Sequence, residues 1–250
     1  MVFFGIIMAV SLYQKALLYG LLCLVSFKAV SEPNNEITVV TEQWPPYNYL
    51  SSSGKVIGSA TKVVEETLQQ ANIPYTLNMY PWARAYKTAL EKPNVLIYSI
   101  LRSPQREKLF HWICPLNTIQ YHFFKLSDRK DIKINSINDV KQYSLGLIRD
   151  SYMHNYLKNN GFIEGEHFQI SGNNQANINL LLAERIDIII DTHENIALRL
   201  KAIPDTIDQF TAAYPIGTDI IPTPWTCMAI SLKTPIELVQ AIKKSHQELK

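Results

Sequence analysis

The sequence carries little excess charge. Its 250 residues include 24 basic and 22 acidic side chains, and the two surplus positive charges, Lys15 and Lys28, both lie within residues 1–31. Residues 32–250 are therefore formally neutral, whereas nucleic-acid-binding domains usually carry a basic patch or stripe. Hydrophobic residues make up 47% of the chain and charged residues only 18%, which excludes a disordered polyelectrolyte. We expect a globular protein that does not bind nucleic acid.

The N-terminal apolar segment is too short to cross a bilayer. Ala16–Phe27 has 12 residues, whereas a spanning helix needs about 20. With Lys15 before it and small residues at 29–31 after it, the segment has the pattern of a cleavable signal peptide. We expect residues 1–31 to direct export into a bacterial periplasm, with translation starting at Met1 or at Met8. The alternative, an uncleaved anchor, would place Lys15 inside the membrane.

Cysteine is also scarce. Only Cys114 and Cys227 follow residues 1–31. In an oxidising compartment the two could form a disulfide, and the alternative is a pair of buried thiols. Neither lies near a Cys or His at metal-ligand spacing, and the six histidines form no HExxH motif. The sequence therefore predicts no metal site and no cofactor.

The rest of the chain alternates between extended and helical patterns. The first set consists of strand-like segments and amphipathic helices at 36–41, 60–71, 73–80, 82–90 and 95–100. This β-α-β-α-β order predicts a parallel α/β sheet. The second set, after Pro115, lies at 136–142, 144–148, 151–160, 167–170, 174–184, 186–190 and 194–201, with a strand at 225–231 and a helix from 236 onward. Two such sets predict a bilobed protein with a cleft between its lobes.

Two aromatic side chains follow the first strand. In the stretch Trp44-Pro45-Pro46-Tyr47 the prolines end the strand and hold a rigid turn, so both rings project from the sheet edge. At the carboxyl end of a strand such rings could stack on a ligand. The alternative is that they pack at the interface between the lobes.

Arg106 lies in a pattern that favours anion binding. Ser103-Pro104 predicts the start of a helix, which would place Arg106 in the first turn beside free backbone N–H groups. A guanidinium there could clamp a carboxylate. The alternative is that Arg102 and Arg106 are both solvated surface residues.

Polar residues follow two strands of the second set. Asp150 and Ser151 offer a hydroxyl and the backbone N–H groups of a helix start. Asp191, with Thr192 and Glu194, follows a buried strand. Asp191 could hold an ammonium group, or it could cap the next helix.

Several segments carry a family resemblance, namely TEQWPPYNYL at 41–50, GKVIG at 54–58, PWARAY at 81–86, SILRSPQREKLFHWICPL at 99–116, SINDVKQYSLGLIRDS at 136–151 and LLAERIDIIID at 181–191. In this order they resemble the bacterial extracellular solute-binding proteins of family 3, the periplasmic receptors for polar amino acids and related molecules. The resemblance runs from about Ile37 to Leu249, and PWARAY is similar to a divergent branch of the family.

The resemblance implies an α/β fold of two lobes, of the type II periplasmic binding protein class, with a hinge of crossover strands and a cleft between the lobes. It implies that lobe 1 covers 32–116, that lobe 2 covers 117–226, and that 227–250 returns to lobe 1. The expected function is capture of a small polar carboxylate, an amino acid or a derivative, and its delivery to a membrane ABC transporter. A signalling partner is the alternative, and we expect a monomer.

The resemblance also implies roles for single residues. Arg106 occupies the position of the arginine that grips an α-carboxylate, and Ser151 lies where groups of the second lobe bind the same carboxylate. Trp44 and Tyr47 match aromatic residues that line the pocket. Asp191 lies near the acid that binds the α-ammonium group.

The sequence departs from the family pattern in several places. Asp191 follows Asp187 by four residues rather than five, which leaves the ammonium contact open. Arg102 adds a cation near the cleft, and we include it with Trp82 of PWARAY among the candidate ligand-binding residues. The chain ends at Lys250, about one helix earlier than family members usually do.

An enzyme on the same scaffold is the second class of function, because a few similar proteins are dehydratases. Glu42, Asp150, His193 and Glu194 are the candidate acids and bases. They come with no triad, nucleophile elbow or metal set. We therefore expect a binding protein with no catalytic residues.

Overall fold

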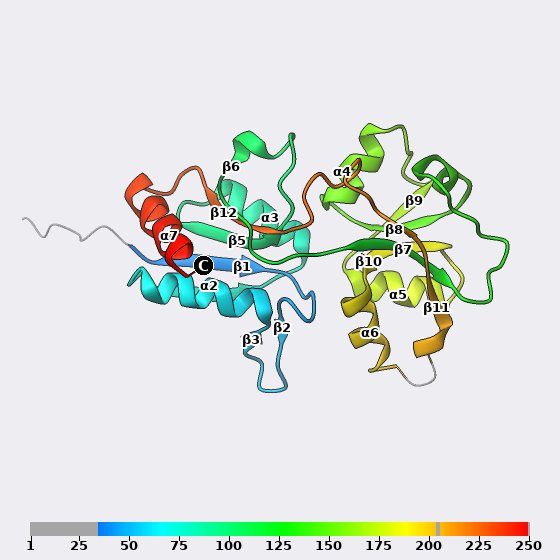
Figure 1. The fold of residues 1–250 in the computed structure, drawn as a ribbon, viewed down its shortest axis with the longest axis horizontal. Coiled ribbons are helices and arrows are strands. Elements are labelled where there is room, and N and C mark those ends of the chain that lie inside the picture. The colour runs from blue at the N-terminus through cyan, green and yellow to red at the C-terminus, as the bar shows by residue number, and fades with distance from the viewer. Residues whose placement is uncertain (1–34, 204–205, 250) are drawn as a thin grey trace, which may run out of the picture. The chain divides into compact units, whose positions relative to one another are not determined.

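The structure is a computed structural model that describes residues 35–203 and 206–249; the expected signal peptide, residues 1–31, lies outside the described residues. Two five-stranded sheets organise the chain, each flanked by helices (Figure 1). The strands are β1 Ile37–Thr41, β2 Tyr49–Leu50, β3 Val56–Ile57, β4 Tyr75–Met79, β5 Val95–Ile100, β6 Phe110–Ile113, β7 Tyr121–Leu126, β8 Leu145–Ile148, β9 Phe168–Ser171, β10 Ile188–Thr192, β11 Phe210–Pro215 and β12 Cys227–Ser231. The helices are α2 Ser59–Gln70, α3 Trp82–Glu91, α4 Tyr152–Asn159, α5 Asn174–Leu182, α6 His193–Leu200 and α7 Ile236–Glu248, with 3₁₀ turns η1 Glu107–Leu109, η2 Ile137–Gln142 and η3 Ile207–Gln209.

Lobe 1 is built on the sheet with strand order β4-β1-β5-β12-β6. Strand β1 pairs in parallel with β4 and β5, as the β-α-β-α-β order predicts. Strand β12 pairs antiparallel with both β5 and β6, so the sheet is mixed rather than wholly parallel. Side chains of α2 and α7 pack with one set of strand residues and those of α3 with the alternate set, so the helices cover both faces.

Lobe 2 is built on the sheet with strand order β11-β7-β10-β8-β9. Strand β8 pairs in parallel with β9 and β10, while β7 pairs antiparallel with β10 and β11. Helices α5 and α6 pack against one face through Ile178, Leu181 and Ile196. Helix α4 packs through Leu157, which lies with Leu145 in the main apolar cluster.

Two crossover segments connect the lobes, 114–120 and 216–226. They run side by side, because Leu116 N donates to the carbonyl of Thr226 (2.7 Å) and Ile119 N donates to that of Pro224 (2.9 Å). Cys114 and Cys227 are joined by a disulfide across 113 residues of sequence. The sequence left open whether these cysteines are bonded or free, and in the structure they are bonded at the lobe 1 end of both crossovers.

Most helices and strands lie within about two residues of the segments that the periodicity predicts. Strands β2, β3, β6, β7 and β11 are the exceptions, since the sequence patterns predict no strand there. The partners of β6, β7 and β11 are distant in the sequence, so only the folded sheet defines these three strands. No helix among the described residues is long and apolar enough to cross a membrane.

Candidate ligand-binding site

The carboxyl ends of β1, β5, β8 and β10 bring the candidate residues together between the lobes. Direct hydrogen bonds link the two sides: Trp44 Nε1 donates to Asp191 Oδ1 (3.0 Å), and the Tyr47 hydroxyl donates to Glu194 at 3.4 Å. Arg199 donates to the carbonyl of Gln43 at 2.6 Å. The segment after β1 is therefore held against the end of β10 and against α6.

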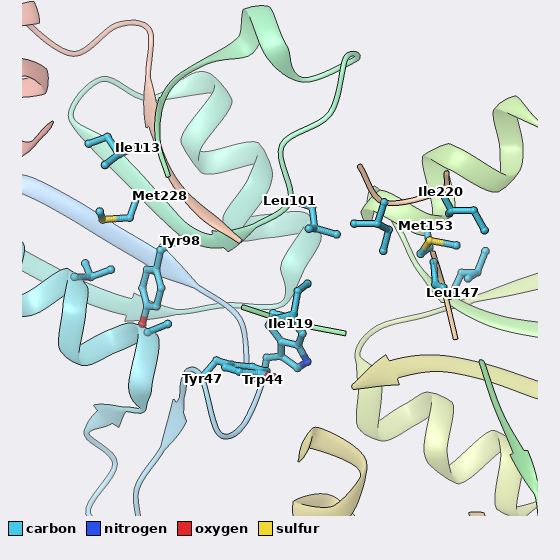
Figure 2. Close-up of a cluster of buried hydrophobic side chains, with 14 of the residues drawn as sticks. Trp44, Tyr47, Tyr98, Leu101, Ile113, Ile119, Leu147, Met153, Ile220 and Met228 are labelled. Carbon is cyan, nitrogen blue, oxygen red and sulfur yellow. The ribbon is translucent and has the colours of Figure 1, made fainter. Parts of the chain in front are cut away.

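The Trp44–Tyr47 turn presents both rings to this interface. Trp44 N donates to the carbonyl of Asn48 (2.7 Å) and Asn48 N donates back to that of Trp44 (3.0 Å), which closes the turn around the prolines. The Trp44 ring stacks on Tyr121 with 5.6 Å between centroids and 9° between planes. Figure 2 shows Trp44 and Tyr47 with Ile119 of a crossover in one apolar cluster. Both rings are buried, so they pack at the lobe interface, and Trp44 also lines a cavity described below.

Arg106 lies in a turn, not in the first turn of a regular helix. The expectation of a helix starting at Ser103-Pro104 is wrong: Arg106 N donates to Ser103, and the chain then forms only the 3₁₀ turn η1. The physical reason is that β6 begins immediately afterwards at Phe110, whose buried ring belongs to the sheet of lobe 1. A long helix would displace that strand.

Arg106 is 3% exposed, and its guanidinium lies between the lobes. It donates to the carbonyl of Leu101 in lobe 1 (3.0 Å) and to that of Asp150 in lobe 2 (2.7 Å). The rings of Trp82 and Tyr86 lie 5.4 and 4.9 Å from its central carbon. Trp82 is thus a buried ring that packs against the arginine, and it does not line either of the two cavities described below.

The charge of Arg106 has no counter-ion. No acidic side chain in the described part of the chain forms an ion pair with it. Burial lowers its pKa, although a guanidinium stays protonated in proteins. A buried cation without an ion pair is costly, so an anion bound beside this guanidinium would be stabilised.

Arg102 points elsewhere. Its side chain is 45% exposed and forms a bidentate ion pair with Glu107, so the structure does not bring it to the site. Arg102 lies only four positions before Arg106, but because of the turn between them the two side chains have different surroundings. The alternative that both arginines are solvated surface residues therefore holds for Arg102 but not for Arg106, which is buried.

Ser151 is the N-cap of α4. Its Oγ accepts a hydrogen bond from His154 N at 3.1 Å, and its hydroxyl proton can still be donated. The preceding Asp150 has φ of 59°, in the left-handed region, which turns its carbonyl toward Arg106. This strained residue is therefore part of the link between the lobes.

Asp191 is buried at the end of β10. It accepts hydrogen bonds from Trp44, Thr192 N and Asn195. The capping alternative for Asp191 is wrong, because the N-cap of α6 is Thr192, whose Oγ1 accepts from Asn195 N. Burial raises the pKa of Asp191 to about 6, and the three donated hydrogen bonds partly oppose this.

Glu42 is a site residue that the sequence offered only as a catalytic candidate. Burial, followed by the nearby Asp191 carboxylate, raises its pKa to about 8, and Arg199 and Arg106 oppose the shift. It lines the same cavity as Trp44. Its position at the end of β1, directly before the aromatic turn, is the signal that could have assigned it to the pocket.

Two cavities lie between the lobes. Cavity A, of about 70 Å³, is lined by Glu42, Trp44 and Leu101 from lobe 1 and by Ser151, Met153 and Asn177 from lobe 2, among others. Figure 2 shows Trp44 and Leu101 on the lobe 1 side and Met153 on the lobe 2 side. Cavity B, of about 490 Å³, has Tyr86, Arg106, Tyr152, Asn155, Tyr156 and Asp219 in its wall.

The two halves of the predicted carboxylate clamp thus face different cavities. Ser151 lines cavity A, Arg106 lines cavity B, and Tyr152 lines both. The Arg106–Asp150 hydrogen bond lies at this junction. Among the described residues no group of three or more His, Cys, Asp or Glu side chains could hold a metal ion.

Comparisons with solved structures identify the fold. The chain superposes on an ancestral arginine-binding protein bound to arginine with a TM-score of 0.71 and 15% identity, covering 86% of this chain and 92% of that one. It has the two-lobed fold of periplasmic binding proteins. The fold class expected from the sequence is thus confirmed.

Two further structures share the fold. A histidine kinase sensor domain with similarity to periplasmic binding proteins gives a TM-score of 0.72 at 15% identity, over 86% of this chain and 90% of that one. The arginine-, lysine-, histidine-binding protein ArtJ from Geobacillus stearothermophilus gives a TM-score of 0.71 at 15% identity, over 86% of this chain and 89% of that one. The sequence matches no protein-family model and no curated protein.

Proposed function

We propose that this protein is a periplasmic solute-binding protein of extracellular solute-binding family 3 that binds a small carboxylate between its lobes. The observation that carries the proposal is the buried, unpaired guanidinium of Arg106, held at the junction of the two lobes. The similarity in fold to amino-acid-binding proteins supports it.

In this proposal the ligand carboxylate takes the place of the Asp150 carbonyl on Arg106. A carboxylate neutralises the guanidinium, which a carbonyl does not, and two parallel N–H···O bonds fit its shape. The Ser151 hydroxyl donates to the same carboxylate from lobe 2. Because the two groups belong to different lobes, binding links them and favours closure.

The ammonium group of an amino acid would bind in cavity A. Glu42 lines this cavity. The carboxylate of Asp191 already accepts hydrogen bonds from Trp44 and Asn195. An ammonium ion beside Glu42 would favour the ionised carboxylate and lower the raised pKa of that residue. A zwitterionic ligand thus matches the charges on both sides of the junction.

We propose a membrane ABC transporter as the partner, reached in the periplasm after cleavage of residues 1–31. A signalling partner is the second candidate, favoured by the shared fold of the histidine kinase sensor domain. Uptake of a bound ligand by cells with and without the gene separates the two. Uptake lost with the gene supports the transporter, and unchanged uptake supports the sensor.

The binding proposal is tested on protein purified from the periplasm. A thermal-shift screen against amino acids, small carboxylates, polyamines and short peptides finds ligands, because a ligand that binds only the folded state raises Tm. Calorimetry then compares Arg106→Ala with Arg102→Ala, the exposed arginine of the same loop. We expect Arg106→Ala to raise Kd at least tenfold, because it removes a hydrogen bond to a charged group. Arg102→Ala should leave Kd unchanged. Equal affinities in both variants would contradict the proposal.

A further inference from the structure

Cavity B is large enough for more than a carboxylate. Its volume of about 490 Å³ lies in the usual range of ligand pockets, about 300–1,000 Å³. Cavity A, at about 70 Å³, lies well below this range. With its carboxylate on Arg106, a ligand can therefore place only a small group in cavity A, and its body has room in cavity B.

Tyrosine rings from both lobes enclose cavity B. Tyr86 of α3 lies on the lobe 1 side, beside the Arg106 guanidinium. Tyr152 and Tyr156, one turn apart on α4, lie on the lobe 2 side with 6.4 Å between ring centroids and 12° between planes. The Tyr152 hydroxyl is anchored on the carbonyl of Ile220 in a crossover segment (2.6 Å). The rings are thus positioned to hold a flat or ring-shaped body between the lobes.

The exposed wall of cavity B is mixed, with the polar Gln105, Asn159 and Asp219 beside the apolar Pro104, Leu109 and Pro222. Asn155 is half-buried, whereas Asn159 and Asp219 are exposed. Burial and the nearby Asp219 carboxylate both raise the pKa of Tyr156, which stays a neutral hydroxyl. The cavity therefore combines a buried cation and aromatic rings with an exposed wall that offers some hydrogen-bonding groups.

We propose that cavity B receives the body of the ligand and selects carboxylates that carry a ring. This inference rests on the proposed function, since it takes Arg106 as the carboxylate anchor. The ring lies against Tyr152 and Tyr156, and polar substituents of the ring contact Asn155 and Asp219. Aromatic amino acids and sugar acids share this chemistry.

The test compares three probes by calorimetry, namely alanine, free tyrosine and galacturonate, on protein purified from the periplasm. Tyr156→Leu removes one ring of the cavity, and Tyr49→Leu is the matched control, because Tyr49 is a partly exposed tyrosine of β2 outside both cavities. We expect a ring-bearing probe to bind more tightly than alanine. Tyr156→Leu should weaken that binding about five- to tenfold, as for loss of an aromatic contact, and Tyr49→Leu should not.

The outcomes separate this inference from the proposed function. Tyrosine binding that depends on Tyr156 supports an aromatic ligand, and galacturonate binding with the same dependence supports a sugar acid. If alanine binds as tightly as both ring-bearing probes, or if Tyr156→Leu changes nothing while Arg106→Ala abolishes binding, the cavity B inference is wrong and the carboxylate site stands. If Arg106→Ala also changes nothing, both are wrong.

Discussion

The indole of Trp44 in lobe 1 donates a hydrogen bond of 3.0 Å to the buried carboxylate of Asp191 in lobe 2, across 147 residues of sequence. This contact occupies one oxygen of the acid that the family resemblance associates with the ligand's ammonium group. The lobes thus contact each other directly at this point, as they also do through Arg106 and Asp150. A ligand must either displace these contacts or add to them.

Trp44→Phe tests the Trp44–Asp191 hydrogen bond while keeping an aromatic ring on Tyr121. The variant leaves a buried carboxylate oxygen with one donor fewer, which costs about 1–3 kcal/mol. We expect a lower free energy of unfolding in urea and a larger radius of gyration in solution scattering, because the lobes part more readily.

The control for this variant is Trp112→Phe, whose indole donates to the exposed carbonyl of Glu107 within lobe 1. Trp112→Phe should change the free energy of unfolding and the radius of gyration less than Trp44→Phe does. Equal effects of the two variants would show that the Trp44 indole contributes no special link between the lobes.

Asp191 and Glu42 should contribute stability at low pH that is lost as the pH rises from about 4 to about 8. In the folded protein the pKa of Asp191 is raised to about 6 and that of Glu42 to about 8, above their usual values of 3.8 and 4.5. The folded state therefore holds protons that the unfolded chain has already lost, and the stabilisation disappears as the pH passes through the folded pKa values.

Measurement of Tm against pH checks this sign. Glu42→Gln should flatten the upper part of the decline, whereas Glu66→Gln, an exposed residue on α2, should leave the profile unchanged. If Glu42→Gln and the wild type show the same pH profile, the raised pKa of Glu42 makes no contribution to stability.

Reduction of the Cys114–Cys227 bond should destabilise the protein. The bond closes a loop of more than a hundred residues, for which the loss of chain entropy in the unfolded state corresponds to about 4–5 kcal/mol. We expect a marked drop in Tm with dithiothreitol for the wild-type protein and no further drop for the Cys114→Ser/Cys227→Ser double variant. Two free thiols in denatured, unreduced periplasmic protein would contradict the bond.

Gly146→Ala should disturb the floor of cavity A. A Cβ at this position of β8 would lie 2.5 Å from Asn177 Oδ1 and 2.6 Å from Ile186 Cδ1, so one of these side chains must move. Overpacking of this kind costs about 1–3 kcal/mol. We expect a lower Tm and altered ligand affinity.

Gly172→Ala is the matched control, because a Cβ there meets no atom within 4 Å. Its Tm should stay near that of the wild type. If Gly146→Ala is as stable as Gly172→Ala, the packing of Asn177 against β8 is looser than the distances indicate.

Local patterns in the sequence predicted most of the elements. Apolar spacing located α2 and α3, and the run Val95–Ile100 is strand β5 as expected. These features depend on neighbours a few residues apart, so periodicity reveals them. Strand β7 was missed because its pairing with β10 and β11 depends on segments more than sixty residues away.

The candidate site could be predicted only in part. The sequence placed Trp44, Arg106, Ser151 and Asp191 at strand ends, where two lobes would bring them together. It also included Arg102 among the candidate ligand-binding residues, and only the fold shows that Arg102 is exposed and paired with Glu107.

By itself the sequence determined the alternation of strands and helices, the two-lobed fold and the chemical types at the strand ends. Only the tertiary structure decided which side chains are buried without a counter-ion, that Thr192 rather than Asp191 caps α6, and that Arg106 and Ser151 open on different cavities. The physical reason is that burial, charge pairing and cavity shape depend on segments that meet across the lobes. Hydrophobic periodicity, in contrast, arises within each segment.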